Sequence, residues 1–194
     1  MRRRSAHAVL IAAFAALRER ENFRLVHYSI QSNHLHLVCE ALNRRELALG
    51  IQALAIRIAK RLNKLWKRAG KLFADRYHDR ILRTPREVRN ALGYVLNNAA
   101  KHGVASIAGR PDPYSSGRWF DGWRGRAREL ETRRPSPLSR ARTWLLSIGW
   151  SRHGPIDCAT STRPSRSAAD RSMSIQDERD RVCTRRSMAM GAPS

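Results

Sequence analysis

A run of apolar residues between positions 43 and 70 constrains the fold of this chain more than any other feature. Its members recur every three or four residues: Leu47, Ile51, Leu54, Ile58, Leu62 and Leu65. This spacing predicts an α-helix with one apolar side, and Asn43 followed by Glu46 is typical of a capping box at its start. Because such a helix has to pack on a second layer of structure, we expect a layered domain.

Two strands are predicted before this helix. Residues 23–30 and 34–40 are rich in β-branched, aromatic and other apolar residues, and residues 31–33 between them are typical of a turn. The pair is therefore expected to form a β-hairpin. Because side chains alternate along a strand, His34 and His36 should place both imidazoles on the same face of the sheet, where they can hold a metal ion.

The remaining periodic segments complete the order helix, strand, strand, helix, strand, helix. We expect the first helix over 6–21, the third strand over 72–83 and the last helix over 84–101. Only an initial strand is missing from the split βαβ sandwich, the ferredoxin-like α+β fold in which an antiparallel sheet carries its helices on one face. The chain is thus expected to be N-terminally truncated. Its histidine strand would expose an unpaired edge unless dimerisation or a later segment fills the gap.

Composition divides the chain into three regions. Residues 1–104 carry the periodic elements, residues 105–155 are rich in tryptophan and arginine, and residues 156–194 consist mostly of serine, arginine and isolated acids without periodicity. The last region is expected to be a disordered tail, and the middle region a helical and irregular extension. The extension contains the aromatic residues Trp119, Phe120, Trp123, Trp144 and Trp150. They are either platforms for stacking nucleic-acid bases or a small cluster docked on the main domain, and composition favours the docked cluster.

The chain carries a formal net charge of +22, from 38 lysines and arginines against 16 acidic residues. Such a charge predicts a polyanionic partner, and nucleic acid is the leading candidate. The expected phosphate contacts lie on the polar side of the long helix and on the third strand: Arg57, Lys60, Arg61, Lys64, Lys67, Arg68, Arg76, Arg80 and Arg83. The alternative is that these residues form an ordinary solvated surface.

The cysteines and the N-terminus bear on the location of the protein. Cys39, Cys158 and Cys183 are odd in number and far apart, which argues against a disulfide framework or a cysteine zinc site and favours the cytoplasm. A basic start and the apolar run 8–17 imitate a secretory signal, so a secreted protein is an alternative. However, the run continues into residues 18–21 as a helix would, and it is shorter than the ~20 apolar residues of a membrane span. No membrane partner is expected.

The last predicted helix offers candidates for chemistry. Its apolar stripe consists of Val88, Leu92, Val95, Leu96 and Ala99. Tyr94 and Asn98 lie outside this stripe and are neighbours, because they are one helical turn apart. Glu87 lies on the same side, where capping of the helix explains it at least as well as positioning of a metal or water.

Other tyrosines and histidines compete for the same roles. Tyr28, Tyr77 and Tyr114 are alternative nucleophiles, but none of them has an amide residue one helical turn away. His27 is better explained as a satisfied strand residue than as a ligand. His78 is either a surface residue or a contact to substrate phosphate.

The arrangement resembles the HUH-type single-tyrosine transposases, and within them the REP-associated tyrosine transposase branch. Three motifs over about residues 23–103 carry the resemblance: Ser-Asn-His-Leu-His-Leu at 32–37, Arg-Tyr-His-Asp-Arg-Ile-Leu-Arg at 76–83 and Tyr-Val-Leu-Asn-Asn at 94–98. The resemblance implies that residues 1–104 form a catalytic domain. It further implies that Tyr94 is the nucleophile and that His34, His36 and Asn98 are the ligands of Mg²⁺ or Mn²⁺.

The activity implied by this resemblance is DNA transposition: metal-dependent cleavage and rejoining of single-stranded or hairpin DNA through a 5′-phosphotyrosine. Two imidazoles and an amide are neutral ligands, so they leave the charge of the cation available to polarise a phosphate. The covalent bond to tyrosine stores the energy for rejoining. One tyrosine per chain implies two copies for full strand exchange, so a homodimer is one expected assembly.

The alternative is a protein of another class, a basic, non-catalytic protein that binds single-stranded or hairpin DNA. Such a remnant of a transposase would keep the arginine surface but would need neither the metal nor the tyrosine.

Overall fold

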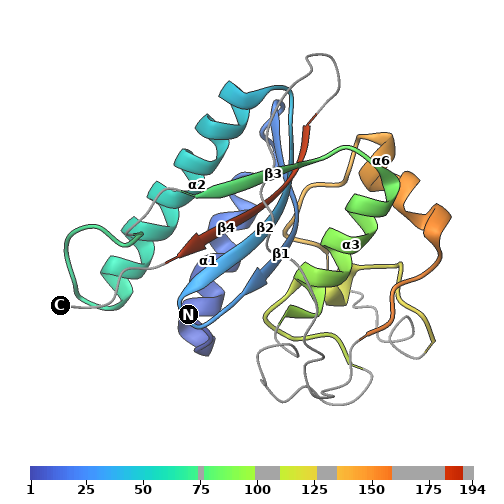
Figure 1. Ribbon diagram of the computed structural model, residues 1–194. Helices are drawn as coiled ribbons and strands as arrows, with labels where there is room; N and C mark the ends of the chain where they lie inside the picture. The colour runs from blue at the N-terminus through green and yellow to red at the C-terminus, as the bar shows by residue number, and fades with distance from the viewer. Residues whose placement is uncertain (74–76, 99–109, 126–134, 159–181, 190–194) are drawn as a thin grey trace.

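The computed structural model describes residues 1–73, 77–98, 110–125, 135–158 and, for the backbone, 182–189. Over these residues the chain is an α+β protein built on an antiparallel sheet (Figure 1). Its elements are α1 (Arg4–Ala15), β1 (Phe23–Ile30), β2 (His34–Ala41), α2 (Arg44–Leu65), β3 (His78–Leu82), α3 (Pro85–Leu96), η1 (Ser116–Trp119), α6 (Trp144–Ser147), η2 (Gly149–His153) and β4 (Val182–Ala189). Within this described part, no helix has both the length and the apolar character needed to cross a bilayer.

The predicted hairpin and the starts of both capped helices are confirmed. β1 and β2 pair antiparallel in one sheet. α2 begins where Asn43 Oδ1 accepts a hydrogen bond of 2.9 Å from the Glu46 N–H. α3 begins at a capping box between Thr84 and Glu87. These elements follow from local sequence, because caps and turns act over three or four residues.

Three predicted elements are shorter in the structure. The last predicted helix, 84–101, corresponds to α3, which ends at Leu96, and residues 99–101 lie outside the described residues. The first helix ends at Ala15 rather than at residue 21, and the largely exposed residues that follow continue in tight turns. The third strand covers His78–Leu82 rather than 72–83, because Leu72 is already buried in the core before the strand begins. Arg76 lies outside the described residues.

The fourth strand of the sheet comes from the far end of the chain. The strand order is β1-β2-β4-β3, and β4 pairs antiparallel with β2 on one side and β3 on the other. The expectation of a disordered tail is therefore wrong for Val182–Ala189. The gap predicted beside the histidine strand is filled by a later segment, because the N–H and C=O groups along β2 and β3 find hydrogen-bond partners there.

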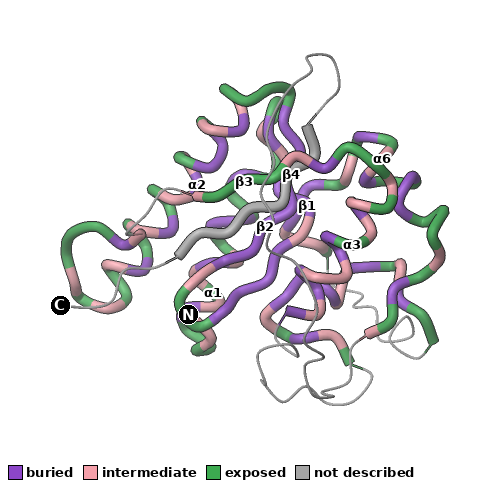
Figure 2. The backbone as a smooth tube through the Cα atoms, viewed as in Figure 1, coloured by how far each residue is buried: buried purple, intermediate pink, exposed green. Residues whose placement is uncertain are grey.

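Apolar side chains cover both faces of the sheet. On one face, α1 and α2 pack on residues of the hairpin that include Tyr28, Leu35 and Leu37. On the other face, α3 packs on Val26 and Val38. The expectation that all helices share one face is therefore wrong for α3 (Figure 1). The physical reason is that β1 and β2 are buried along nearly their whole length, so both faces need cover (Figure 2).

The extension contacts both faces of the sheet, and most of its buried aromatic side chains pack on the α3 face. Phe120, Trp123 and Trp150 are buried there, and the Phe120 ring centroid lies 5.2 Å from that of Trp123 and 5.1 Å from that of Trp150. These three residues form the docked cluster that composition favoured. Trp119 is partly buried against the α1 and α2 side, whereas Trp144 is 46% exposed.

Candidate active site

The two histidines of β2 point their rings toward one another on the α3 face of the sheet. Their Nε2 atoms are 3.1 Å apart, and the ring centroids are 4.7 Å apart with an angle of 85° between the ring planes. His36 is buried and His34 is partly exposed. Two nitrogens this close either share one proton or both direct lone pairs at a common cation, so the pair has the geometry of two metal ligands.

Tyr94 of α3 lies against this pair. The Tyr94 ring centroid is 5.3 Å from that of His36, and the planes are 81° apart. Tyr94 is partly buried and packs beside the apolar cluster that holds α3 on the sheet. The structure therefore brings His34, His36 and Tyr94 together, although a strand and a distant helix supply them.

Asn98 lies one turn beyond Tyr94, and its side chain is fully buried. Neither its Oδ1 nor its Nδ2 atom has a hydrogen-bond partner among the described residues, so no hydrogen bond joins it to either histidine. A buried amide without partners costs free energy unless a ligand compensates for it. The neighbouring Asn97 instead donates to the Asp157 carbonyl at 3.0 Å and fixes the end of the helix.

The candidate donor atoms are two imidazole nitrogens and one amide oxygen. Imidazole nitrogens suit transition metals, whereas a carbonyl-type oxygen suits Mg²⁺ and Mn²⁺. Within the described residues, no three histidine, cysteine, aspartate or glutamate side chains are grouped to hold a metal. Asn98 supplies a buried amide oxygen without a hydrogen-bond partner among these residues.

The competing tyrosines all pack against the α1 and α2 cluster on the opposite face of the sheet. Tyr28 is fully buried, with its ring centroid 4.8 Å from that of Phe14, and burial raises the pKa of its hydroxyl. Tyr114 lies beneath the Arg2 guanidinium, and Tyr77 is partly buried. The tyrosine whose ring contacts the histidine pair is Tyr94.

Glu87 has a capping role. Partial burial opposes ionisation of its carboxyl group, but hydrogen bonds from Arg83, Arg80 and Thr84 outweigh burial and lower its pKa. The Arg80 guanidinium lies 3.0 Å from its Oε1 atom. The carboxylate is thus engaged at the start of α3, away from Tyr94 near the end of the same helix.

His27 is a structural residue of β1. Its Nδ1 atom is 3.2 Å from the Ser116 hydroxyl, and its ring meets the Phe120 ring edge-on at 5.5 Å. Burial lowers the pKa of His27 to about 4. His78 is exposed at the start of β3, in register with Ser187 of β4, which in turn lies opposite His36.

The basic residues predicted to contact phosphate divide between two sides of the molecule. The six from Arg57 to Arg68 belong to α2 or directly follow it, and α2 packs on the sheet face opposite α3. Arg80 pairs with Glu87 of α3, so it lies on the side of the histidines. Arg83 is exposed between β3 and α3. The long basic stripe is therefore not part of the histidine and tyrosine cluster.

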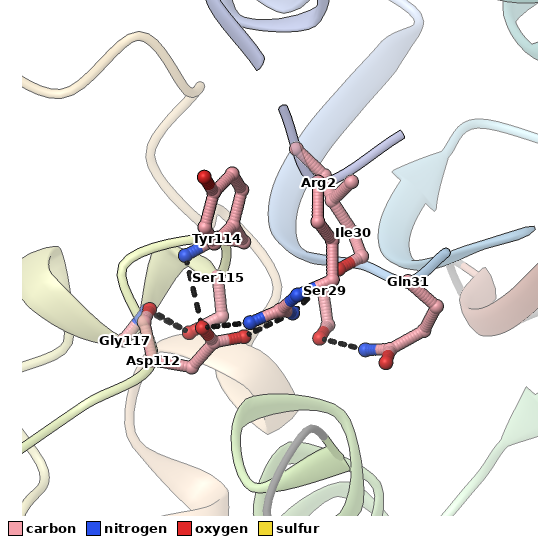
Figure 3. Close-up of polar contacts among 8 residues, drawn as sticks. All are labelled: Arg2, Ser29, Ile30, Gln31, Asp112, Tyr114, Ser115 and Gly117. Carbon is pink, nitrogen blue, oxygen red and sulfur yellow. Dashed lines mark hydrogen bonds and ion pairs between the residues drawn. The ribbon is translucent and has the colours of Figure 1, made fainter. Parts of the chain in front are cut away.

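Arg2 near the N-terminus links Asp112 of the extension to the end of the hairpin that carries His34; we call these contacts the latch. Both Asp112 carboxylate oxygens accept from the Arg2 guanidinium, at 2.6 and 2.8 Å, and Arg2 also donates to the Ile30 carbonyl at 2.8 Å (Figure 3). The Met1 amino group donates to the Ser32 carbonyl. Sequence patterns did not find this latch, because nothing local couples Arg2 to a residue of the extension.

Comparisons of the chain with protein-family models, with curated proteins and with solved structures found no match. A function for this chain therefore has to be argued from its own residues and their arrangement.

Proposed function

We propose that this chain is a DNA-processing protein of the single-tyrosine HUH transposase type. Its reaction is cleavage and rejoining of single-stranded or hairpin DNA, with Tyr94 as the nucleophile. The observation that carries the proposal is the meeting of Tyr94 with two histidines whose Nε2 atoms are 3.1 Å apart. A tyrosine placed beside two potential metal ligands combines a nucleophile with a site for a cation that can polarise the phosphate it attacks.

The metal ligands in this proposal are His34, His36 and Asn98. When bound there, Mg²⁺ or Mn²⁺ supplies Lewis-acid polarisation of the scissile phosphate. The unpartnered, buried Asn98 amide supports this assignment, because a cation would compensate its oxygen.

The residues of the chain perform the covalent step. A bond forms between Tyr94 Oη and phosphorus while the bond from phosphorus to the 3′ oxygen breaks, and the phenolic proton ends on the released 3′ oxygen. The product is a 5′-phosphotyrosine and a DNA strand with a free 3′-hydroxyl. Reversal of the step with another 3′-hydroxyl rejoins strands.

The proposed fold is a ferredoxin-like sandwich in which β4 takes the place of the missing first strand. The strand order β1-β2-β4-β3, with β4 antiparallel to both neighbours, supports this proposal. In that architecture the histidine strand lies inside the sheet, where both of its edges are paired and its side chains are held rigidly. We expect the protein to act in the cytoplasm, with two copies cooperating in strand exchange.

A second candidate is DNA binding without catalysis. It is favoured by the location of the basic α2 surface, which lies across the sheet from Tyr94 and can contact phosphates whether or not the site is active. This candidate needs neither a metal nor the tyrosine.

A labelled hairpin oligonucleotide incubated with the protein and Mn²⁺ distinguishes the two functions. The proposed enzyme gives an adduct that survives SDS and is lost in Tyr94→Phe. Tyr28→Phe is a matched control, because the Tyr28 hydroxyl is buried without a partner among the described residues, and it should keep the adduct. Gel retardation without any adduct supports the binding protein and contradicts the enzyme.

A further inference from the structure

Asn33, the last residue of the hairpin turn, contacts one of the two histidines. Its Oδ1 atom lies 2.8 Å from His34 Nδ1, on the side of the ring opposite the His36 contact. Asn33 itself is exposed, whereas the histidine that it contacts is partly buried. The spacing of the histidines does not predict a role for Asn33.

The chemistry of this contact fixes the position of a proton. An amide oxygen only accepts hydrogen bonds, so the Nδ1 atom of His34 has to be the donor. A neutral imidazole carries one proton on its two nitrogens, and therefore the lone pair of His34 lies on Nε2. That lone pair faces His36 Nε2 across 3.1 Å, in the place where a cation would bind.

We propose that Asn33 is a positioning residue, which holds His34 in the tautomer whose Nε2 atom can bind the divalent cation. The cation part of this inference rests on the proposed function, whereas the tautomer does not. An acceptor on the second nitrogen is the usual device by which proteins orient a metal-binding histidine and raise its basicity.

The turn is built to hold Asn33 in place. The Gln31 N–H donates to the His34 carbonyl at 2.9 Å and closes the turn. The Gln31 side chain donates to Ser29 Oγ at 2.7 Å, and the N-terminal amino group binds the Ser32 carbonyl. Because these contacts fix the backbone on both sides of Asn33, its short side chain loses little entropy when it binds the ring.

Nitrogen-15 NMR of the metal-free protein tests the tautomer directly. With ¹⁵N-labelled histidine, at a pH above about 8 where an ordinary imidazole is neutral, His34 should show a protonated Nδ1 and an unprotonated Nε2. Asn33→Ala should move His34 toward a mixture of tautomers. Asn33→Asp should keep the wild-type tautomer, because a carboxylate oxygen also accepts. Ser32→Ala, which changes an exposed neighbour, is the matched control and should leave the spectrum unchanged.

Titration with Mn²⁺, followed by electron paramagnetic resonance of the free ion, tests whether Asn33 strengthens binding of the cation. Asn33→Ala should bind Mn²⁺ about 10- to 100-fold more weakly, and Asn33→Asp should restore binding. Equal melting temperatures for the variants would separate this effect from unfolding.

The two experiments distinguish failure of the positioning role of Asn33 from failure of the proposed metal site. A wild-type His34 with its proton on Nε2, or a tautomer unchanged in Asn33→Ala, overturns the positioning role whatever the metal does. Failure of the wild type to bind Mn²⁺ while the tautomer responds to Asn33→Ala supports the positioning role and contradicts the proposed metal site instead.

Discussion

His36 of β2 and Tyr94 of α3 lie ring to edge, with centroids 5.3 Å apart and planes 81° apart. The contact exists because α3 packs on the same face of the sheet that carries the histidines, through Val38 two residues further along β2. The apolar cluster between α3 and the sheet therefore fixes the position of Tyr94 relative to His36.

Replacement of Asn98 by leucine should raise stability in the absence of metal. The wild type buries an amide without hydrogen-bond partners among the described residues, and removal of such a group returns about 1–3 kcal/mol of free energy of unfolding, less any cost of packing a branched side chain. If the proposed metal site is correct, Mn²⁺ should stabilise the wild type and should not stabilise this variant. Urea denaturation with and without Mn²⁺ measures both effects.

Asn97→Ala is the matched control for this prediction. Asn97 precedes Asn98 and donates to the Asp157 carbonyl, so its loss should cost about 1 kcal/mol equally with and without Mn²⁺. An Asn98→Leu protein that is destabilised by several kcal/mol without metal would show that the amide has a structural role.

His27 should make the protein less stable in weak acid. Burial lowers its pKa to about 4 in the folded state, whereas the unfolded residue titrates near 6.5. As the pH falls from 6.5 toward 4, the unfolded state therefore takes up a proton that the folded state does not, and stability is lost. Between about pH 7 and pH 5 the loss should reach about 2 kcal/mol. Urea denaturation of wild type and His27→Gln at both pH values measures it.

In His27→Gln this part of the pH dependence should disappear, because glutamine does not titrate. His153→Gln changes an exposed histidine of η2 and should retain the wild-type loss. If His27→Gln loses as much stability between pH 7 and pH 5 as the wild type, His27 is not the residue responsible for the loss.

Much of the fold and part of the site were predictable from the sequence, because they depend on local physics. The caps at Asn43 and Thr84 act on N–H groups three residues away, and the alternation of a strand placed His34 and His36 together. The helical wheel placed Tyr94 and Asn98 outside the apolar stripe, whereas in the structure Tyr94 packs against the apolar cluster and Asn98 is fully buried.

The remainder depends on contacts between distant segments. Nothing in the run Val182–Ala189 shows that it would pair with the histidine strand; only the unsatisfied edge of that strand indicates that some segment must. Similarly, the side of the sheet on which α3 packs depends on both faces of the hairpin being apolar. The contact of Asn33 with His34 is short in sequence, but side-chain direction at a turn is not given by periodicity.

Truncation after residue 181 should disrupt the sheet. Without β4, the inner edges of β2 and β3 lose their hydrogen-bond partners, and we expect a largely unfolded or aggregated chain, because stabilities of domains this size are only about 5–15 kcal/mol. Circular dichroism and size-exclusion chromatography measure the change. A chain that ends after Ala189 keeps β4 and should behave like the full chain. A truncated protein that melts like the wild type would contradict the place of β4 in the sheet.

Loss of one partner of the Arg2–Asp112 pair should lower the free energy of unfolding more than loss of both partners. The Asp112 carboxylate is nearly buried, so Arg2→Met leaves an uncompensated charge and should lower stability by about 3 kcal/mol. Arg2→Met combined with Asp112→Asn should recover part of this loss, because the charge is gone and the amide oxygen can still accept from the Tyr114 N–H. Additive losses in a double-mutant cycle would show that the two groups are not coupled.

Mass spectrometry of the covalent adduct shows whether Tyr94 is the residue that attacks DNA. Wild-type protein is incubated with the hairpin oligonucleotide and Mn²⁺, and then digested with nuclease and trypsin. We expect a nucleotide attached to the peptide Asn90–Lys101 at Tyr94, and its loss in both His36→Ala and Tyr94→Phe. A nucleotide on Tyr28, Tyr77 or Tyr114, or no modified peptide under conditions in which the DNA is bound, would contradict this expectation.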